Sequence, residues 1–339
     1  MPRITIADIA QRAGVSTGAV SYALNDRPGV SDRTRARILS VAAELGWQPS
    51  SAARSLSGER SEALGLVLAR DPGMLGVEPF YMQFLAGIES VLSKRSYALL
   101  LQVVPDLESE LRTYASWRAA RRVDGVIIVD PRNDDPRIGM FLQEGALPAV
   151  VVGDTTLARG LTNVWTDDAA AMRESVRYLY AMGHRNIARV GGVESFGHTL
   201  IRDLAFKDEV DRLGARGVTR RTDYTAVQGA SATRDLLTDD IRPTAIIYDN
   251  DIMAVAGLGV ASEMGIGVPR EVSMIAWDDS PLCEATFPRL SALSHDVTRY
   301  GAHVARRLFD RIDGAEPASF LDSTPRLRTR GTTTRHVNE

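Results

Sequence analysis

The first sixty residues place apolar side chains with the period of short α-helices. Ile6, Ile9, Ala10 and Ala13 form one helical stripe, which Thr5 can cap and which ends at a glycine. Two similar stripes follow, comprising Val20, Ala23 and Leu24 after Ser16, and Ile38, Val41, Ala42 and Leu45 after Ser31. Only residues 14–16 separate the first two predicted helices. Because a tight glycine-containing turn joins them, the pattern predicts a helix-turn-helix arrangement.

From residue 62 onward, apolar runs alternate with amphipathic stretches. The strand-like runs are 63–69, 97–104, 123–129, 149–152, 187–191, 245–248 and 273–277. The helical stretches lie near 80–95, 106–120, 135–145, 167–182, 201–213, 229–238 and 250–264. This alternation predicts parallel sheets with helices on both faces, and the length favours two such sheets facing each other across a cleft. Ligands bind beyond the carboxyl ends of such strands.

The net charge of −3 conceals an uneven distribution of charge along the 339 residues. Residues 1–60 carry eight arginines and five acidic residues, whereas the remainder carries 32 basic and 38 acidic residues. A basic head of this kind suits the phosphates of nucleic acid, and an acidic body repels them. We therefore expect the head, and not the body, to meet DNA.

The sequence contains neither a membrane-spanning pattern nor a disulfide pattern. No run approaches the roughly 20 apolar residues of a membrane helix, and MPRITIADIA has no apolar signal core. Cys283 is the one cysteine, so it cannot form an internal disulfide or a cysteine-based metal site. We expect a soluble cytoplasmic protein without a membrane partner.

The second predicted helix carries small and hydrogen-bonding residues opposite its buried stripe. Thr17 and Tyr22 are suited to reading base edges, because the N-terminal part of this helix enters the major groove in a helix-turn-helix protein. Ser16, Ser21 and Asn25 suit phosphate oxygens. Gly18 lies on the same face. The alternative interpretation is an ordinary solvated face of a three-helix bundle.

Enzymatic interpretations of the body find little support in its motifs. GLGVAS at 257–262 lies inside a helical stretch, whereas a dinucleotide-binding fingerprint follows a strand. Ser195 lacks the glycine spacing of a nucleophile elbow. The five histidines show no metal-binding pair. We predict no catalytic residue, no metal and no cofactor. His184, just after a predicted helix, is expected to act as a cation at that helix's C-terminus.

The head sequence resembles the lactose/galactose repressor (LacI/GalR) family of transcriptional regulators. The resemblance rests on TIADIAQRAGVSTGAVSYALN at 5–25 and GVSDRTRARILSVAAELGWQPSSAARSLSG at 29–58. Shorter matches in the body are GIESVLSKRSYALLL, DGVIIVD, GHRNIA and VSMIAWDD. The resemblance implies a helix-turn-helix head, a hinge helix and a body of two doubly wound parallel-sheet subdomains, similar to periplasmic binding proteins.

For DNA binding, the resemblance implies two groups of residues. The head residues are Thr5, Ser16, Thr17, Gly18, Ser21, Tyr22, Asn25, Ser31 and Thr34. In the hinge, Leu56 matches the leucine that wedges into the central base step, Ala52 and Ala53 match small groove-facing residues, and Arg54 adds a phosphate contact. The implied partner is a double-stranded, pseudo-palindromic operator bound by a homodimer, since the C-terminus lacks the leucine heptads of a tetramerising tail.

For ligand binding, the resemblance implies a small polar effector in the cleft. Arg202, Asn250 and Asp278 match the family's arginine, amide and carboxylate, and Phe80 and Tyr81 match its aromatic pair. Alternative roles are a surface ion pair for the arginine, a helix cap for Asp278 or its neighbour Asp279, and core or dimer packing for the aromatics. A sugar is the first choice of effector.

The chain also departs from the family in the body. RDPGMLGVEP at 70–79 is longer and more apolar than the usual link, and Ala205 replaces a common glycine. Trp277 replaces a smaller aromatic, and Gly153 stands at a position that is often acidic, where Asp154 can partly substitute. These departures leave a purine, a nucleoside or another metabolite open as the effector.

We therefore expect an effector-controlled repressor with three parts. Residues 1–47 form the helix-turn-helix domain, 48–60 the hinge, and 61–339 the effector-binding and dimerisation domain. Within the body, one subdomain comprises 61–163 and 294–324, and the other comprises 164–293 and 325–339. The sequence does not decide whether the effector releases or promotes DNA binding. The alternatives are a solute-binding protein or an α/β enzyme with the same body fold.

Overall fold

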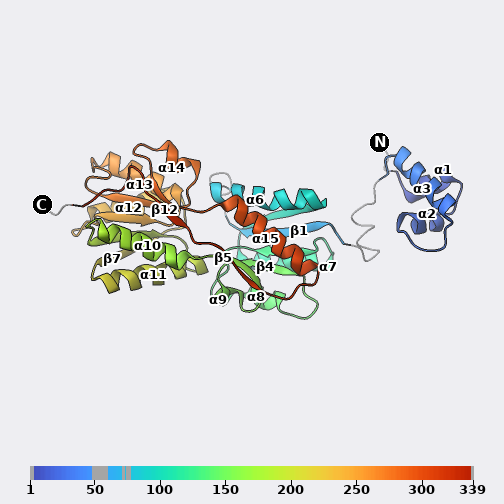
Figure 1. Cartoon of the computed structure of the whole chain (residues 1–339), viewed down its shortest axis with the longest axis horizontal. Coiled ribbons are helices and arrows are strands. Elements are labelled where there is room, and N and C mark those ends of the chain that lie inside the picture. The colour runs from blue at the N-terminus through green and yellow to red at the C-terminus, as the bar shows by residue number, and fades with distance from the viewer. Residues whose placement is uncertain (1–3, 48–59, 71–72, 74–77, 337–339) are drawn as a thin grey trace. The chain divides into compact units, whose positions relative to one another are not determined.

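A computed structural model describes residues 4–47, 60–70, 73 and 78–336. The chain divides into two compact units, Met1–Ser61 and Glu62–Glu339, which we call the head and the body. The head is a three-helix unit and the body is a two-lobed α/β unit (Figure 1). The hinge residues Ala52, Ala53, Arg54 and Leu56 lie outside the described residues.

The head packs three short helices around one small core. The helices are α1 (Ile6–Ala13), α2 (Thr17–Leu24) and α3 (Asp32–Glu44). Ile9, Val20 and Ile38, one from each helix, are fully buried against one another. Thr5 caps α1 and forms a reciprocal capping box with Asp8, in which each side chain bonds the other's backbone. The predicted helix-turn-helix arrangement is confirmed.

The first lobe of the body is a parallel sheet in the order β11-β5-β4-β3-β1-β2. Its strands are β1 (Ala63–Ala69), β2 (Ala98–Val104), β3 (Gly125–Ile128), β4 (Ala149–Val152), β5 (Thr162–Thr166) and β11 (Ser319–Ser323). Helices α6 (Pro79–Leu92) and α15 (Val297–Ile312) pack on one face of this sheet, and α7 (Leu107–Ala119) and α8 (Pro136–Phe141) pack on the other. The short elements η1 (Ser93–Arg95) and α9 (Thr155–Ala158) complete the lobe.

Glycines allow α6 and α15 to cross at close range. A Cβ atom added at Gly87 would lie 2.0 Å from the carbonyl oxygen of Thr298, and one at Gly301 would lie 2.1 Å from that of Phe84. No larger residue fits at either position, so the two backbones touch there. The crossing buries Phe84, Ile88 and Val304 completely.

The second lobe is a sheet in the order β12-β10-β9-β8-β6-β7, parallel except for β12 against β10. Its strands are β6 (Asn186–Gly191), β7 (Arg216–Arg221), β8 (Ala245–Tyr248), β9 (Ser273–Trp277), β10 (Ser291–Ser294) and β12 (Arg326–Arg328). Helices α10 (Asp168–Ala181) and α11 (Gly197–Leu213) cover one face, and α12 (Ala226–Thr238) and α13 (Asp251–Glu263) cover the other. A short helix, α14 (Pro281–Ala285), follows β9.

The predicted class of two parallel-sheet α/β subdomains is confirmed. The chain crosses between the lobes three times, between β5 and α10, between β10 and α15, and between β11 and β12. Because β5 continues to Thr166 and its Val164 packs in the first core, the first crossing lies a few residues after residue 163. None of the described helices is long and apolar enough to span a membrane.

Candidate functional site

The outer face of α2 presents most of the residues predicted to read DNA. Thr17, Gly18, Tyr22 and Asn25 are exposed, while Ser21 is half-buried. Tyr22 has 46% of its surface exposed. Its ring lies beside Gly29, where an added Cβ would approach the ring carbon Cδ2 to 3.2 Å. The loop after α2 therefore supports this side chain without burying it.

Arg35 on α3 fixes the C-terminal end of α2. Its guanidinium donates to the carbonyl oxygens of Ala23 at 3.2 Å and Arg27 at 2.7 Å, and it pairs with Asp26 at 2.8 Å. The Ala23 carbonyl belongs to the last turn of α2, where carbonyl groups lack partners within the helix, and the Arg27 carbonyl lies in the loop that follows. The orientation of α2 in the head is thus set by a charged contact as well as by the apolar core.

Three of the predicted DNA-binding hydroxyls cap helices. The Thr5, Ser16 and Ser31 side chains accept hydrogen bonds from the backbone N–H groups of Asp8, Ala19 and Thr34, respectively. The Ser31 hydroxyl also donates to that of Thr34 at 2.9 Å. Helix N-termini attract phosphate because their first N–H groups point outward. These residues hold such N-termini at the surface of the head.

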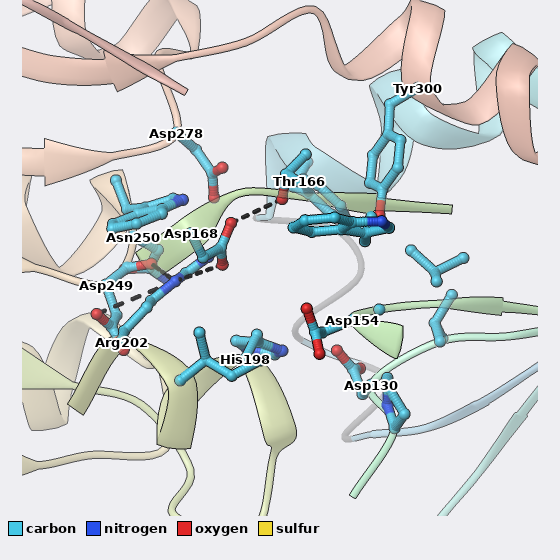
Figure 2. Close-up of a pocket in the computed structure, with 18 of the residues that line it drawn as sticks. Asp130, Asp154, Thr166, Asp168, His198, Arg202, Asp249, Asn250, Asp278 and Tyr300 are labelled. Carbon is cyan, nitrogen blue, oxygen red and sulfur yellow. Dashed lines mark hydrogen bonds and ion pairs between the residues drawn. The ribbon is translucent and has the colours of Figure 1, made fainter. Parts of the chain in front are cut away.

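A polar cavity lies between the two lobes of the body, beyond the carboxyl ends of several strands. Its volume is about 110 Å³. The first lobe contributes residues such as Asp130 and Asp154, and the second contributes Asp168, Arg202 and Asp278 (Figure 2). All six predicted effector residues line this one cavity: Phe80, Tyr81, Asp154, Arg202, Asn250 and Asp278. Parallel-sheet topology explains the convergence, because it gathers distant strand ends at one edge.

Arg202 on α11 is held by several partners at the cavity wall. Its Nε donates to Asp168 Oδ2 at 2.8 Å, and its Nη1 donates to the carbonyl oxygen of Asp249 at 3.3 Å. The guanidinium carbon lies 3.7 Å from the ring centroid of Trp277. The side chain is thus positioned before any ligand arrives, which reduces the entropy lost on binding.

Asn250 and Asp154 both serve as helix caps. The Asn250 side-chain oxygen accepts from Met253 N at 2.9 Å and caps α13, while its amide donates to Tyr224 O at 3.1 Å. Asp154 Oδ1 accepts from Thr156 N at 2.9 Å and caps α9. The amide of Asn250 therefore already has partners within the protein. Asp154 accepts from Thr155 and Thr156 through Oδ1 and also lines the cavity (Figure 2).

Asp278 follows β9 in the left-handed backbone region, with φ of 62°. Burial raises the pKa of its carboxyl well above the usual value, and the nearby Asp251 adds to this shift. Its side chain lies 3.9 Å from His295 Nε2. The alternative role as a helix cap falls to Ser280, which caps α14. Asp279 instead pairs with Arg330 at 2.8 Å.

The aromatic pair lies partly in the core of the first lobe. Tyr81 is 1% exposed and donates its hydroxyl to Asp130 Oδ2 at 2.7 Å. Phe80 is half-buried, meets Tyr81 edge-on at a centroid distance of 5.4 Å, and stacks on Phe84. Both side chains combine core packing with a place in the cavity wall.

Much of the charge in the cavity wall comes from residues that the sequence did not indicate. Arg70 donates to Asp130 at 2.8 Å and lies 3.4 Å from Glu78. Burial opposes ionisation of Asp130, but Arg70, His198 and the hydrogen bond from Tyr81 together lower the pKa of this carboxyl to about 2. The other missed residues in the wall are Trp165, Asp168, His198, Tyr224, Asp249, His295 and Tyr300. Asp249 directly follows β8, and one residue separates Asp130 from β3. Both positions could therefore have been found from the predicted ends of the strands.

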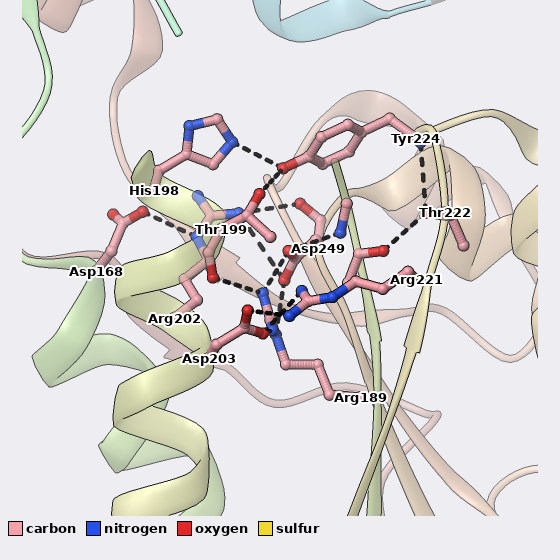
Figure 3. Close-up of polar contacts among 12 residues, drawn as sticks. Asp168, Arg189, His198, Thr199, Arg202, Asp203, Arg221, Thr222, Tyr224 and Asp249 are labelled. Atoms are coloured by element: carbon pink, nitrogen blue, oxygen red, sulfur yellow. Dashed lines mark hydrogen bonds and ion pairs between the residues drawn. The ribbon is translucent and has the colours of Figure 1, made fainter. Parts of the chain in front are cut away.

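A buried ion network supports Arg202 from behind (Figure 3). Arg189 on β6 is fully buried and donates to both oxygens of Asp249, at 3.1 and 2.5 Å. It also pairs with Asp203, which in turn pairs with Arg221. Burial opposes ionisation of Asp249, yet Arg189 and Arg202 keep its pKa below the usual value. The network fixes the strand end that carries Asp249.

The remaining sequence interpretations of the body can be compared with the structure. His184 lies against Thr244 and Thr334, and burial lowers its pKa to about 4, so the prediction of a cation there is wrong. Cys283 is buried in α14. GLGVAS lies inside α13, as expected, and does not follow a strand. Among the described residues, no cluster of three potential metal ligands occurs.

Comparisons with known proteins identify both units. Residues 5–50 match the family described as bacterial regulatory proteins, lacI family, and residues 176–333 match a periplasmic binding protein-like domain. The HTH-type transcriptional repressor PurR of Erwinia tasmaniensis is 30% identical, with 91% of this chain and 90% of that protein covered. The regulator CelR of Thermobifida fusca is 29% identical, with 95% of this chain and 96% of that protein covered.

Solved structures show the same relationship. A LacI family transcriptional regulator from Bifidobacterium animalis subsp. lactis is 37% identical, with a TM-score of 0.77, covering 82% of this chain and all of that one. The lac repressor dimer bound to operator is 26% identical, with a TM-score of 0.84, and the match covers 98% of this chain and 100% of that one. A CelR–cellobiose complex is 26% identical, with a TM-score of 0.74, and the match covers 97% of this chain and 100% of that one.

A helix-turn-helix head followed by a two-lobed, periplasmic-binding-protein-like body defines a class of DNA-binding transcriptional regulators. The chain belongs to the LacI family of these regulators. It is therefore a regulator and not an enzyme.

Proposed function

We propose that this regulator is a dimeric repressor whose operator affinity is controlled by a small molecule bound between the lobes of the body. The observation that carries the proposal is the convergence of six residues, from well separated segments, on one polar cavity. The same chain carries a head whose α2 presents an exposed polar face. A ligand that binds one arrangement of the lobes more tightly shifts DNA affinity by that difference, and DNA shifts ligand affinity equally.

For the DNA contacts, we propose that Thr17 and Tyr22 read bases. The hydroxyls and amides of Ser16, Ser21 and Asn25 bind phosphates in this proposal, together with the Thr34 hydroxyl and the N-termini capped by Thr5 and Ser31. The hinge residues Ala52, Ala53, Arg54 and Leu56 complete the interface in this proposal, with the leucine as a wedge in the minor groove. A dimer on a pseudo-palindrome is supported by the lac repressor dimer bound to its operator.

For the ligand, we propose that Arg202, Asp278, Asp154, Phe80 and Tyr81 contact it, and that Asn250 positions the strand end that faces it. A sugar is the first candidate, supported by the CelR–cellobiose complex and by the hydrogen-bonding groups of the wall. Because its target is operator DNA, we propose that the protein acts in the cytoplasm.

Selection from a random DNA library with the full chain tests the proposed function. The expected result is enrichment of a pseudo-palindromic motif whose half-sites change when Tyr22 is replaced. Enrichment of no motif, or equal affinity for all sequences, would contradict specific DNA recognition. A retained motif together with no ligand response in any screen would contradict control by a small molecule.

A further inference from the structure

The chain enters the body at Glu62, at the end of the first lobe where the strands begin. The Glu62 N–H donates to Asp124 Oδ2 at 2.9 Å, and its carbonyl oxygen accepts from the N–H of Ala98 at 2.9 Å. Ala98 begins β2, and Asp124 immediately precedes β3. The loop before β2 and the loop before β3 therefore flank the entry point on its two sides, in keeping with the strand order β3-β1-β2.

Both flanking loops carry exposed cations. Because α6 connects β1 to β2 and α7 connects β2 to β3, both helices run back across the lobe and end where these strands begin (Figure 1). Lys94 and Arg95 lie in η1, just after α6, while Arg118, Arg121 and Arg122 lie at the end of α7 and in the turn that follows it. We call these five exposed residues the entry patch.

Few acids balance the entry patch. Asp124 already accepts the backbone N–H of Glu62, and Asp313 lies 3.7 Å from Arg95, which also stacks on the ring of Phe309 at 4.2 Å. With Glu62 itself, three acids thus face five cations at the entry point. The rest of the body has the opposite balance, since residues 61–339 together carry 32 basic and 38 acidic residues.

Three members of the entry patch are available to a partner. The side chains of Lys94, Arg118 and Arg122 are exposed and form no hydrogen bond or ion pair with any residue that the structure describes. Exposed, unpaired cations of this kind attract phosphate groups, and they do so without regard to base sequence.

Capping of helix ends does not account for these three cations. Cations are favourable near a helix C-terminus, where they can bond the last carbonyl groups. Two arginines of the second lobe show that contact: Arg185 Nη1 donates to the carbonyl oxygen of Tyr180 at 2.8 Å, and Arg242 Nε donates to that of Leu237 at 3.0 Å. The three unpaired cations of the entry patch make no such bond.

The chain itself links any duplex bound by the head to this end of the body. Residues 48–59 separate the described parts of the two units, and a segment of that length spans at most roughly 45 Å when fully extended. A contact between the body and the same duplex is therefore intramolecular. Cation–phosphate contacts that are weak on their own then still add to the affinity.

We propose that the entry patch binds backbone phosphates of the DNA duplex that the head recognises. Lys94, Arg118 and Arg122 supply the charges, and the acidic remainder of the body repels the duplex. This surface lies outside the head and hinge contacts of the proposed function. It also changes the expectation from the sequence that the head alone meets DNA, because the acidic average of the body conceals a basic end.

Fluorescence anisotropy of the full chain on its selected operator, at several salt concentrations, tests this inference. The patch variant is Lys94→Gln/Arg118→Gln/Arg122→Gln. Each lost phosphate contact lowers the slope of log affinity against log salt concentration by about 0.9, so the slope should become shallower by about 2 to 3. The affinity near about 50 mM salt should fall at least about tenfold. The operator sequence selected by the variant should stay the same, because these contacts read no bases.

A matched control changes the net charge of the body equally at another place. Arg216→Gln/Arg270→Gln/Arg326→Gln removes three exposed arginines of the second lobe whose side chains also lack partners among the described residues. This control variant should keep the slope and the affinity of wild type. A loss in the patch variant alone then reflects local contacts and not the net charge of the chain.

Two more variants separate phosphate contact from damage to the fold. Lys94→Arg/Arg118→Lys/Arg122→Lys preserves the charges and should keep the slope of wild type. If the patch variant does not fold, Arg122→Gln alone decides, with an expected change in slope of about 0.9.

Two results would overturn the inference. One is a salt slope equal to that of wild type in the folded patch variant or in Arg122→Gln, and the other is an equal change in slope in the control variant. Both leave the proposed function standing, because operator selection and the response to a ligand are measured separately.

Discussion

Gly197 donates its backbone N–H to the carbonyl oxygen of Pro131 at 2.8 Å, and this bond joins the two lobes. Pro131 follows β3 of the first lobe, and Gly197 begins α11 of the second. The neighbouring residues Arg132 and Phe196 form an antiparallel bridge at the same place. A Cβ atom at Gly197 would lie 2.2 Å from Leu157 Cδ1 and 2.9 Å from the Pro131 oxygen. The lobes can approach this closely because Gly197 has no side chain.

Gly197→Ala is therefore expected to hold the lobes apart and to weaken ligand binding. Small-angle scattering should show a larger radius of gyration, and calorimetry a several-fold weaker affinity for the cavity ligand, because fewer molecules occupy the closed form. Gly139→Ala on α8 is the control, since its Cβ meets no atom within 4 Å. If Gly197→Ala and Gly139→Ala have the same radius of gyration and the same ligand affinity, the contact between Gly197 and Pro131 does not govern closure of the lobes.

Arg189→Met should destabilise the body by about 3–5 kcal/mol, because it leaves buried Asp249 without its main counter-ion. The double variant Arg189→Met/Asp249→Asn should recover part of this loss, since the uncompensated charge is gone. Urea denaturation of the full chain measures both. A double variant less stable than the single one would contradict an electrostatic role for this pair.

Glu78 is predicted to make stability fall as pH rises. Burial raises the pKa of its carboxyl from 4.5 to about 7, so the folded state binds a proton that the unfolded state has released. The stabilisation is fully present below pH 4.5 and is lost as pH rises toward 7. His198 acts in the opposite direction, because its pKa is lowered to about 4. The difference in unfolding free energy between wild type and Glu78→Gln isolates the effect of Glu78 from that of His198.

The comparison is the free energy of unfolding of wild type and Glu78→Gln at several pH values. The stability of wild type relative to the variant should decrease between pH 4.5 and 7 and then level off. A difference that stays constant over this range would show that Glu78 does not titrate in the folded body as predicted.

Tyr22→Ala should change the half-site sequence selected from a random library, because the exposed ring lies on the face of α2 that we propose to enter the groove. Leu39→Ala on α3 is a matched control, since Leu39 is 47% exposed and Tyr22 is 46% exposed. The control should select the wild-type motif. If wild type, Tyr22→Ala and Leu39→Ala all select the same motif, Tyr22 does not read bases.

The sequence predicted several buried strands with their observed bounds, but among the four edge strands it predicted β2 and missed β7, β11 and β12. Ala63–Ala69, Ala149–Val152, Ala245–Tyr248 and Ser273–Trp277 match β1, β4, β8 and β9, because strands buried on both faces are continuous apolar runs. β7 reads RGVTRR and lies at a sheet edge, where charged residues are tolerated, so hydrophobicity gave no signal. α15 has a clear helical stripe, and the prediction of elements omitted it.

Site residues could be predicted from the sequence where they lie in a recognisable motif. They could not be predicted where their role depends on partners far away in the sequence. The resemblance supplied Arg202 and Asp278, and strand ends could have supplied Asp130 and Asp249. Nothing local to Arg189 indicates that an arginine within a strand is fully buried. Its partners are Asp249, just after β8, and Asp203 on α11, and only the assembled fold brings these segments to β6.

The central claim is that a ligand in the cavity controls the affinity of the head for DNA. Fluorescence anisotropy of the full chain on its selected operator, with and without a saturating ligand from the screen, measures this directly. We predict a change in affinity of at least about fivefold, and no change for Arg202→Ala at the same ligand concentration. Superimposable curves for wild type with and without bound ligand would contradict the claim.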